Sequence, residues 1–494
     1  MTVELAARDH LSLANLARAA FAGEAVRFAT SAAQRMDWAR GHFLELLSAN
    51  PDAFVYGVTT GGGMDALKRI PQSQWQQKAA RPPQAFGQAF GGGVLPDAAV
   101  RAIVFARLAN FVEGNAAISS ATAARVAAML DGGAMPVVPR WGQAGPGEIV
   151  PLGHIMSELR DGALGIREDG ALYNGSPVSA GLAGHAALLA APRLRLMARI
   201  FALSIEAFKA PLDAYDPALR PLWGDDHESR ALAMLWADIG QADRSERRFY
   251  QAPVSWRIVP RLLGTALRAA DTLADVAAVS LRSVTDNPVY VPPDHPTCGD
   301  DHPHGRVFSN GGYHNATATP AMDSLAAALA DLISLAHRQV VKMHKPAVSE
   351  LPDRLMVAAH NFSTHRLDYV ANGLEEEARR AAQTTLLSSG EIGASEQDDV
   401  PVMTVVAWNG LDTVSRLADA MMAVLAASAS QALQVTGRRP AAALRDLLDD
   451  VRHWFPPVES PRAQGDELAA LASAFTRSIE RLDGRGPVAE GAQT

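Results

Sequence analysis

The amino-acid sequence predicts a mainly α protein built on a bundle of long helices, with glycine-rich loops gathered around a site. Three long alanine-rich segments carry the helical pattern, at residues 260–284, 321–343 and 411–435. Alanine has the highest helix propensity, and its small side chain lets neighbouring helices approach closely. Convincing strand signals are few, which also favours a helical fold.

The shorter elements can be placed in chain order. The segment 96–114 begins with Pro96 and repeats apolar residues at helical spacing, which predicts a helix. Two short runs at 286–293 and 306–313 predict a β-hairpin across the loop between them. We expect three parts: an N-terminal helical part with the loops at 1–210, a central long-helix bundle with C-terminal helices at 211–483, and a flexible polar tail at 484–494.

Composition restricts the class of protein. The net charge of −8, without any basic block, argues against nucleic-acid binding. The most apolar long run, from Leu417, is broken by Asp419 and by serine and glutamine, which suits a buried helix better than a membrane span. A single cysteine, Cys298, and the absence of a secretory apolar region near the start lead us to expect a cytoplasmic protein.

Loops rich in Gly, Asn and Pro separate the helices and are the most informative segments. Binding and catalytic residues concentrate on loops that a rigid scaffold holds in place, so we expect these loops to meet at one site. They lie at residues 56–63, 86–96, 142–148, 173–177, 283–288 and 309–315.

The motifs VYGVTTGGG, LYNGS, SVTDNPV, SNGGYHN and SEQDDVPVM follow one another along almost the whole chain. In this order the sequence resembles the aromatic amino acid lyase family, the histidine and phenylalanine ammonia-lyases and related aminomutases. The resemblance implies a long helix bundle, similar in fold to fumarase and aspartase. It also implies a homotetramer whose active sites take residues from several subunits, or a heteromer with a paralogous chain.

The loop GQAGPGE departs from the family at its central triad. Family members build an electrophile, a methylidene-imidazolone, from an Ala-Ser-Gly triad whose backbone cyclises and whose serine loses water. Anchoring on the PLGH motif that follows puts Gly145, Pro146 and Gly147 at the triad. Proline has no hydroxyl to lose, and its tertiary nitrogen cannot become the ring nitrogen. We therefore expect a vestigial loop, without this prosthetic group or another cofactor.

Other positions of the family site also differ, while a coherent subset is retained. Gln88 replaces the family's active-site His, and Tyr313 replaces a Phe near the electrophile. Tyr56 matches the catalytic base, Arg257 the residue that holds the substrate carboxylate in a bidentate pair, and Asn174 the residue that orients it. Val254 replaces a family Tyr, and the order of the pair Glu396–Gln397 is exchanged. The resemblance predicts that the catalytic residues are Tyr56, Tyr313 and Gln88. It predicts that the substrate-binding residues are Arg257, Asn174, Glu396, Gln397, Val254 and Trp256.

Each of these residues also has a structural interpretation. A phenol of ordinary pKa is a poor base, so Tyr56 needs a nearby cation or helix N-terminus to act; otherwise it caps a glycine-rich turn. Arg257 alone would suit a structural ion pair, and Asn174 a tight Asn-Gly turn. The loop from His295 to His304 is rich in histidine and acid, but its spacing matches no closed metal site, so we expect no metal there.

Two classes of function follow. The favoured one is an enzyme of the lyase fold that works without the imidazolone on an amino acid or other carboxylic acid, in specialised metabolism. Abstraction of a proton next to a carbonyl needs only a base and stabilisation of the enolate, and it can lead to elimination, addition, isomerisation or cyclisation. The alternative is a non-catalytic ligand-binding or regulatory subunit of the same fold. Conventional ammonia loss is the least favoured.

Overall fold

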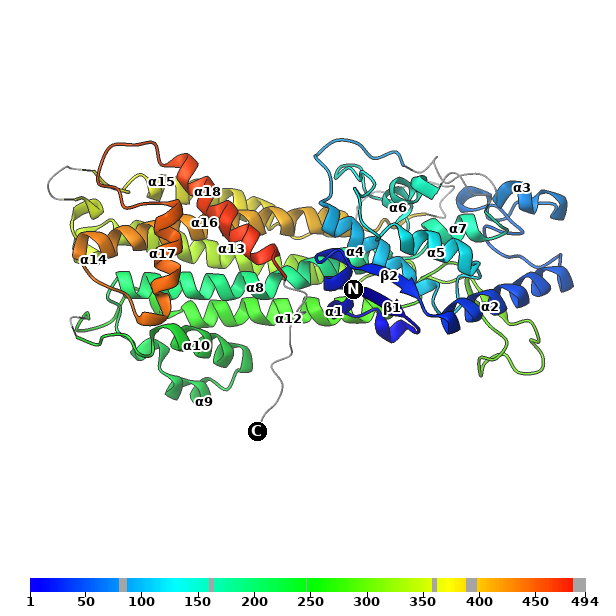
Figure 1. Cartoon of the computed structure of the whole chain (residues 1–494), viewed down its shortest axis with the longest axis horizontal. Coiled ribbons are helices and arrows are strands. Elements are labelled where there is room, and N and C mark those ends of the chain that lie inside the picture. The colour runs from blue at the N-terminus through cyan, green and yellow to red at the C-terminus, as the bar shows by residue number, and fades with distance from the viewer. Residues whose placement is uncertain (80–86, 160–163, 246, 358–361, 388–397, 483–494) are drawn as a thin grey trace.

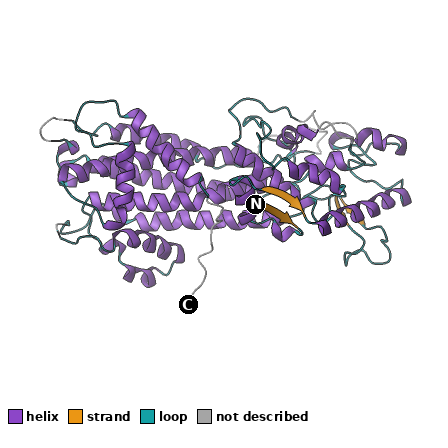
Figure 2. Cartoon of the chain, viewed as in Figure 1, coloured by secondary structure: helices purple, strands orange, loops and turns teal. Residues whose placement is uncertain are grey.

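The computed structural model describes residues 1–79, 87–159, 164–245, 247–357, 362–387 and 398–482. The molecule is elongated and mainly helical, as the sequence predicts (Figures 1 and 2). Four long helices lie side by side along the left and centre of Figure 1. They are α8 (Pro177–Ala207), α12 (Val259–Arg282), α13 (Ala318–Met343) and α16 (Thr404–Thr436).

Shorter helices surround this bundle. Those that precede it in the chain are α1 (Leu13–Ala20), α2 (Thr30–Ala49), α3 (Trp75–Ala79), α4 (Asp97–Arg107), α5 (Ser120–Ala128), α6 (Ile149–Met156) and α7 (Glu168–Tyr173). The later ones are α9 (Arg220–Trp223), α10 (Asp226–Ile239), α11 (Val254–Arg257), α14 (Pro346–Ser349), α15 (Leu367–Ala381), α17 (Arg445–Trp454) and α18 (Gly465–Glu480). Helices α2, α3, α5, α6 and α7 lie together at the right of Figure 1.

Helix α8 organises the bundle. Proline at its first position suits a helix start, and most of its residues are buried, because α4, α12 and α16 all pack on it. Helix α8 ends at Ala207, just before the predicted boundary at residue 210, whereas its partners α12 and α16 lie beyond that boundary. The bundle therefore begins at Pro177, before that boundary. The tail predicted at 484–494 lies outside the described residues.

Two small two-stranded sheets lie in the described part of the chain. Strands β3 (Val289–Val291) and β4 (Arg306–Phe308) pair antiparallel, which confirms the predicted hairpin. Strands β1 (Thr2–Leu5) and β2 (Ala25–Phe28) pair in parallel on either side of α1, a pairing that the sequence did not reveal. Each has only four residues, the shortest length at which an alternating pattern can be recognised.

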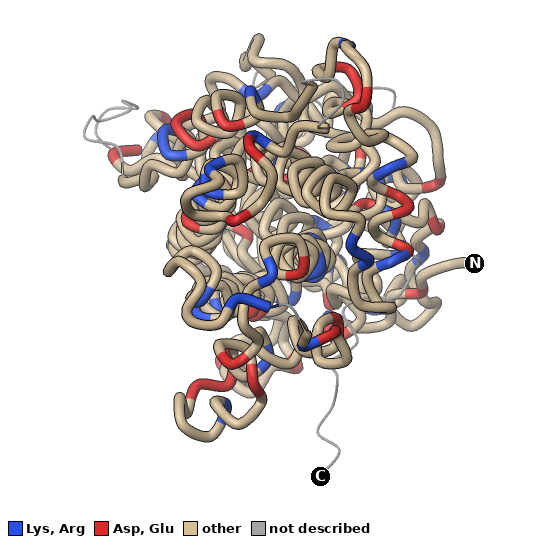
Figure 3. The backbone as a smooth tube through the Cα atoms, turned by 90° about the vertical axis from the view of Figure 1, so that its left-hand side faces the viewer, with Lys and Arg blue, Asp and Glu red and all other residues tan. Residues whose placement is uncertain are grey.

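Charged residues of both signs are mixed at the left end of the molecule (Figure 3). Seen along the bundle from its left end, Lys and Arg are interspersed with Asp and Glu (Figure 3). Among the described helices, none combines the length and the apolar character that a membrane crossing requires.

Close contact between α8 and α4 gives a test of the packing. A Cβ at Gly181 would lie 2.5 Å from the backbone nitrogen of Ile103. Gly181→Ala should therefore lower the thermal unfolding midpoint, with a loss of about 1–3 kcal/mol from overpacking. Gly41 in α2 is exposed and has nothing within 4 Å of the added Cβ, so Gly41→Ala should keep or raise the midpoint. Equal effects of the two changes would contradict the packing described here.

Candidate active site

Loops from distant parts of the sequence bring two predicted tyrosines to the same end of the molecule. Tyr56 follows α2, and its hydroxyl oxygen accepts a hydrogen bond from the Gly63 amide at 2.8 Å. Tyr313 follows β4, and its ring lies against Gly147, where an added Cβ would be 3.5 Å from the ring. Tyr313 contributes to raising the pKa of Tyr56, which places the two phenols in the same region.

The surroundings of Tyr56 raise its pKa. Burial is the main cause, and the nearby Asp398 and Tyr313 act in the same direction. Only the hydrogen bond from Gly63 favours the phenolate. Asp398 was not among the predicted site residues, although it directly follows the Glu396–Gln397 pair in the sequence. Glu396 and Gln397 themselves lie outside the described residues.

The Gly145–Pro146–Gly147 loop is held by its backbone. The Gly145 carbonyl accepts a hydrogen bond from the Val402 amide at 2.9 Å, just before α16. Gly147 has φ of +62°, a left-handed conformation that glycine adopts without strain. Since Pro146 offers neither an amide hydrogen nor a hydroxyl, the residues present do not fit the imidazolone group. The loop instead joins the start of α6 to the segment that enters α16.

Glu148 completes this loop and was missed by the sequence analysis. Its carboxylate accepts hydrogen bonds from the amides of Val178 and Ser179 and from the Ser179 hydroxyl, so it caps the N-terminus of α8. Burial raises the pKa of Glu148 to about 7, although the bonds from Ser179 and Val178 and the charge of Arg107 hold it down. The sequence signal that could have identified Glu148 is an acidic residue at the end of a glycine-rich loop, directly before the start of an apolar helix.

Asn174 lies between α7 and α8, above a buried group of charges. Its carbonyl accepts a hydrogen bond from the fully buried Arg107. Asp286 lies 2.9 Å from the Arg167 guanidinium and 3.8 Å from that of Arg107. Burial lowers the pKa of Arg107 to about 10, so it stays charged at neutral pH. Two guanidinium groups face the carboxylate of Asp286 and the carboxyl of Glu148, whose pKa of about 7 leaves it about half ionised at neutral pH, so a partial excess of positive charge remains beside Asn174.

Gln88, the third predicted catalytic residue, is exposed in the loop before α4. Its neighbours Gly87 and Ala89 contact the imidazole of His154 in α6. Burial lowers the pKa of His154, which favours the neutral ring. His154 served only to align the triad in the sequence analysis, and the structure adds it to the groups beside the Gln88 loop.

Arg257 lies at the other end of the bundle. Its Nε donates to the Ala252 carbonyl at 2.9 Å, and it lines an open cavity of about 230 Å³ with Phe249, Tyr250 and Gln251 among its other walls. Within the described residues no carboxylate lies within 4.0 Å of its guanidinium. Phe249 and Tyr250 are highly exposed. The structural ion pair considered for Arg257 is therefore not found in this part of the chain.

The two apolar residues before Arg257 behave differently. Val254 is 55% exposed and can contact a ligand. Trp256 is 0% exposed: its ring stacks on Phe208, and its Nε1 donates to the Ser204 hydroxyl at 3.2 Å. The prediction of Trp256 as a substrate contact is thus corrected. It is a core residue that anchors α11 to the end of α8.

A single chain therefore carries two separate half-sites. The loop half-site comprises Tyr56, Gly145–Gly147, Asn174 and Tyr313, and the arginine half-site comprises Phe249, Tyr250, Gln251 and Arg257. Asn174 precedes the first turn of α8, whereas Trp256 contacts Ser204 in its last turn. A helix of 31 residues is about 46 Å long, so one chain cannot close both halves around a small molecule.

Comparison with known proteins defines the class. The structure superimposes on the ergothioneine-degrading enzyme ergothionase of Treponema denticola with a TM-score of 0.86 at 17% identity, covering 98% of this chain and 100% of that one. It superimposes on the tyrosine aminomutase of Streptomyces globisporus with a TM-score of 0.83 at 20% identity, covering 96% of each chain. The fold is therefore that of the helix-bundle lyases and aminomutases.

The family follows from the sequence comparisons. The model of the aromatic amino acid lyase family matches residues 11–163 and 156–453. The histidine ammonia-lyase of Gloeobacter violaceus is 29% identical over 489 residues, which cover 92% of this chain and 91% of that protein. The tyrosine ammonia-lyase of Cereibacter sphaeroides is 29% identical over 478 residues, with coverage of 85% and 87%. The chain belongs to the aromatic amino acid lyase family, as its motifs predict.

The raised pKa of Glu148 has a consequence for stability. Below about pH 4.5 the carboxyl is protonated in both the folded and the unfolded chain, and its stabilising contribution is complete. As pH rises toward 7, the unfolded chain releases the proton but the folded chain retains it, so stability falls, by up to about 3 kcal/mol. Glu148→Gln cannot titrate. We expect the wild-type unfolding midpoint minus that of Glu148→Gln to decrease between pH 4.5 and 7.

The matched control is Glu377→Gln, a change of the same type at an exposed position of α15. Its difference from the wild type should stay constant over the same pH range. If the Glu148→Gln difference instead grew with pH, the bonds from Ser179 and Val178 would outweigh burial, and the direction of the pKa shift would be wrong.

Proposed function

We propose that this chain is an enzyme that abstracts a proton from an aromatic amino acid or a related carboxylic acid, without an imidazolone electrophile, in a specialised pathway. Elimination, addition, isomerisation or cyclisation can follow that step. Support for the substrate class comes from the relatives, which are named as histidine and tyrosine ammonia-lyases, a tyrosine aminomutase and an ergothioneine-degrading enzyme.

The observation that carries the proposal is the state of Arg257. A guanidinium at the wall of an open cavity, without an acidic partner among the described residues, is available to bind a carboxylate through two parallel hydrogen bonds. The exposed rings of Phe249 and Tyr250 and the side chain of Val254 lie in the same segment. These residues suit a substrate with an apolar or aromatic part next to its carboxylate.

The proposal requires a second copy of the chain. Because α8 separates the half-sites, the arginine half-site of one chain must meet the loop half-site of another, as in the homotetramer that the family resemblance implies. An arrangement of this kind explains why exposed aromatic residues surround Arg257 in the isolated chain. Assembly with a paralogous chain would satisfy the same geometry.

The same assembly would also change the pKa of Tyr56. Within one chain, burial raises this pKa, which disfavours the phenolate that a base must supply. A guanidinium from a second chain offsets the charge of the substrate carboxylate, and where it lies nearer to the phenol than that carboxylate does, it lowers the pKa of Tyr56. When Tyr56 takes the substrate proton, the electron pair moves toward the carboxylate. The field of Arg107 and Arg167 beside Asn174 stabilises that charge.

A non-catalytic binding subunit is the second candidate, and one observation favours it. Among the groups that act on the Tyr56 pKa, burial, Asp398 and Tyr313 all oppose ionisation. A phenol in this state is a hydrogen-bond donor suited to holding a ligand. If no cation reaches Tyr56 in the assembly, the site binds a carboxylate without transforming it, on its own or as part of a paralogue's active site.

A mass-spectrometric assay separates the two candidates. Wild type, Tyr56→Phe and Arg257→Met are incubated with a host metabolite extract and, separately, with histidine, tyrosine and phenylalanine. We expect the wild type alone to convert a carboxylic acid, because each variant lacks the proposed base or carboxylate clamp. The product mass then identifies ammonia loss, water loss or addition, or a change without mass difference.

Conversion that survives both substitutions would refute the assigned roles, and a ligand retained without conversion would favour the binding subunit.

Sharing of the site between chains predicts complementation. Tyr56→Phe and Arg257→Met should each abolish conversion, yet their co-expression should restore up to about a quarter of it, because random assortment leaves that share of sites with an intact residue from each chain. The matched control is co-expression of Arg257→Met with a chain carrying both changes, which cannot form an intact site. Recovery in the control, or none in the test, would contradict a site shared in this way.

A further inference from the structure

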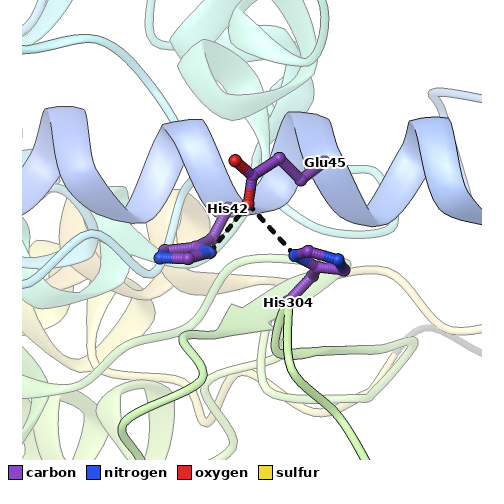
Figure 4. A group of neighbouring side chains, drawn as sticks. All are labelled: His42, Glu45 and His304. Carbon is purple, nitrogen blue, oxygen red and sulfur yellow. Dashed lines mark hydrogen bonds and ion pairs between the residues drawn. The ribbon is translucent and has the colours of Figure 1, made fainter.

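We propose that His42, Glu45 and His304 form a binding site for a divalent transition-metal ion, with zinc as the ion best suited to it. The site lies between α2 and the loop that joins β3 to β4 (Figure 4), and it shares no residue with either half-site. It does not depend on the proposed function. The sequence analysis expected no metal because it considered the ligands of the 295–304 loop alone.

The three side chains converge on one point. His42 and Glu45 are three residues apart in α2, so they share one face of the helix. The Nδ1 atom of His42 lies 2.9 Å from Oε2 of Glu45, and the Nδ1 atom of His304 lies 3.0 Å from the same oxygen. All three ligand atoms lie within 4.8 Å of one another. Figure 4 shows both imidazoles directed toward the carboxylate.

These separations are close to those of a metal site. Zinc binds imidazole nitrogen and carboxylate oxygen at about 2.0–2.2 Å, which places two ligands of a tetrahedral ion about 3.3 Å apart. The two gaps between histidine and Glu45, 2.9 and 3.0 Å, need to open by only a few tenths of an ångström. The third gap, between the ligand atoms of the two histidines, is no more than 4.8 Å.

The chemistry of the donor set selects the class of ion. Two imidazole nitrogens and one carboxylate oxygen match zinc and its neighbours in the first transition series, whereas calcium and magnesium prefer oxygen ligands throughout. Glu45 is 56% exposed and His304 36% exposed, so solvent can reach the ion and supply a water as a fourth ligand. A histidine and a glutamate three residues apart on one helix are also metal ligands in the di-iron helix bundles.

The framework around the three residues is fixed before any metal arrives. Trp38, one turn before His42, packs edge-on against its ring, with centroids 4.8 Å apart. Arg35 stacks over Trp38 and forms two hydrogen bonds to Asp294, at 2.6 and 2.9 Å. Asp294 belongs to the same loop as His304. The loop is therefore already attached to α2 by an ion pair, and this reduces the entropy lost when a metal joins them.

The site connects the two segments that carry the candidate tyrosines. Helix α2 ends shortly before Tyr56, and β4 leads from His304 to Tyr313. A metal at this position would join these segments and limit their relative motion. A structural role of this kind predicts that metal binding stabilises the fold whether or not the protein turns over a substrate.

Metal titration of the full-length protein tests the proposal. The protein is stripped with a chelator, dialysed, and titrated with ZnCl₂ by calorimetry and with CoCl₂ by visible absorption. We expect one ion per chain for the wild type and a rise in the unfolding midpoint when zinc is present. His42→Ala and His304→Ala should each weaken binding at least about a hundredfold, since even changes outside the ligand set cost 10–100-fold. They should also abolish the zinc-dependent rise.

The matched control is His295→Ala, in the same loop but outside the cluster, where Nδ1 interacts with Thr297 instead. This variant should bind zinc as the wild type does. Unfolding midpoints measured without metal show whether each variant is folded. Absence of binding to the folded wild type, or binding that His42→Ala and His304→Ala leave unchanged, would overturn the assignment.

Discussion

The length and stiffness of α8 determine what one copy of this chain can do. The helix holds Asn174 and the buried arginines at one end and Trp256, with Arg257 beside it, at the other. Its close packing on α4, α12 and α16 leaves it no freedom to bend the ends together. Any function that uses both half-sites is therefore a property of an assembly, and the exposed rings near Arg257 are the surface such an assembly would cover.

The Gly145–Pro146–Gly147 loop has a structural task that does not depend on its chemistry. Gly145 still bonds to Val402 at the entrance to α16, and Glu148 still supplies a carboxylate to the N-terminus of α8. These contacts tie together the starts of α6, α8 and α16. The positive φ of Gly147 accounts for a glycine at that position, so this glycine is not by itself evidence that the site is catalytic.

Sequence patterns predicted the features that depend on local spacing. Helix periodicity revealed α12, α13 and α16, and two short apolar runs gave the β3–β4 hairpin. Motif order gave the family and the tyrosines that meet at one end. The same patterns could not show that Trp256 stacks on Phe208, or that His304 meets α2, because these contacts join segments far apart in the chain. The neighbours of Tyr56 escaped notice for the same reason.

Electrostatics decides between a catalyst and a binder at the loop half-site. The positive field beside Asn174 favours an anion in either case, so it cannot distinguish them. Tyr56 can distinguish a catalyst from a binder, because the free energy of its ionisation depends on which charges the assembly places near it. A substrate carboxylate alone would raise the pKa of Tyr56 further, as Asp398 does, and keep the phenol neutral. A guanidinium paired with that carboxylate offsets the effect of the carboxylate. The position of Arg257 from a second chain relative to the Tyr56 hydroxyl is therefore the quantity on which the function depends.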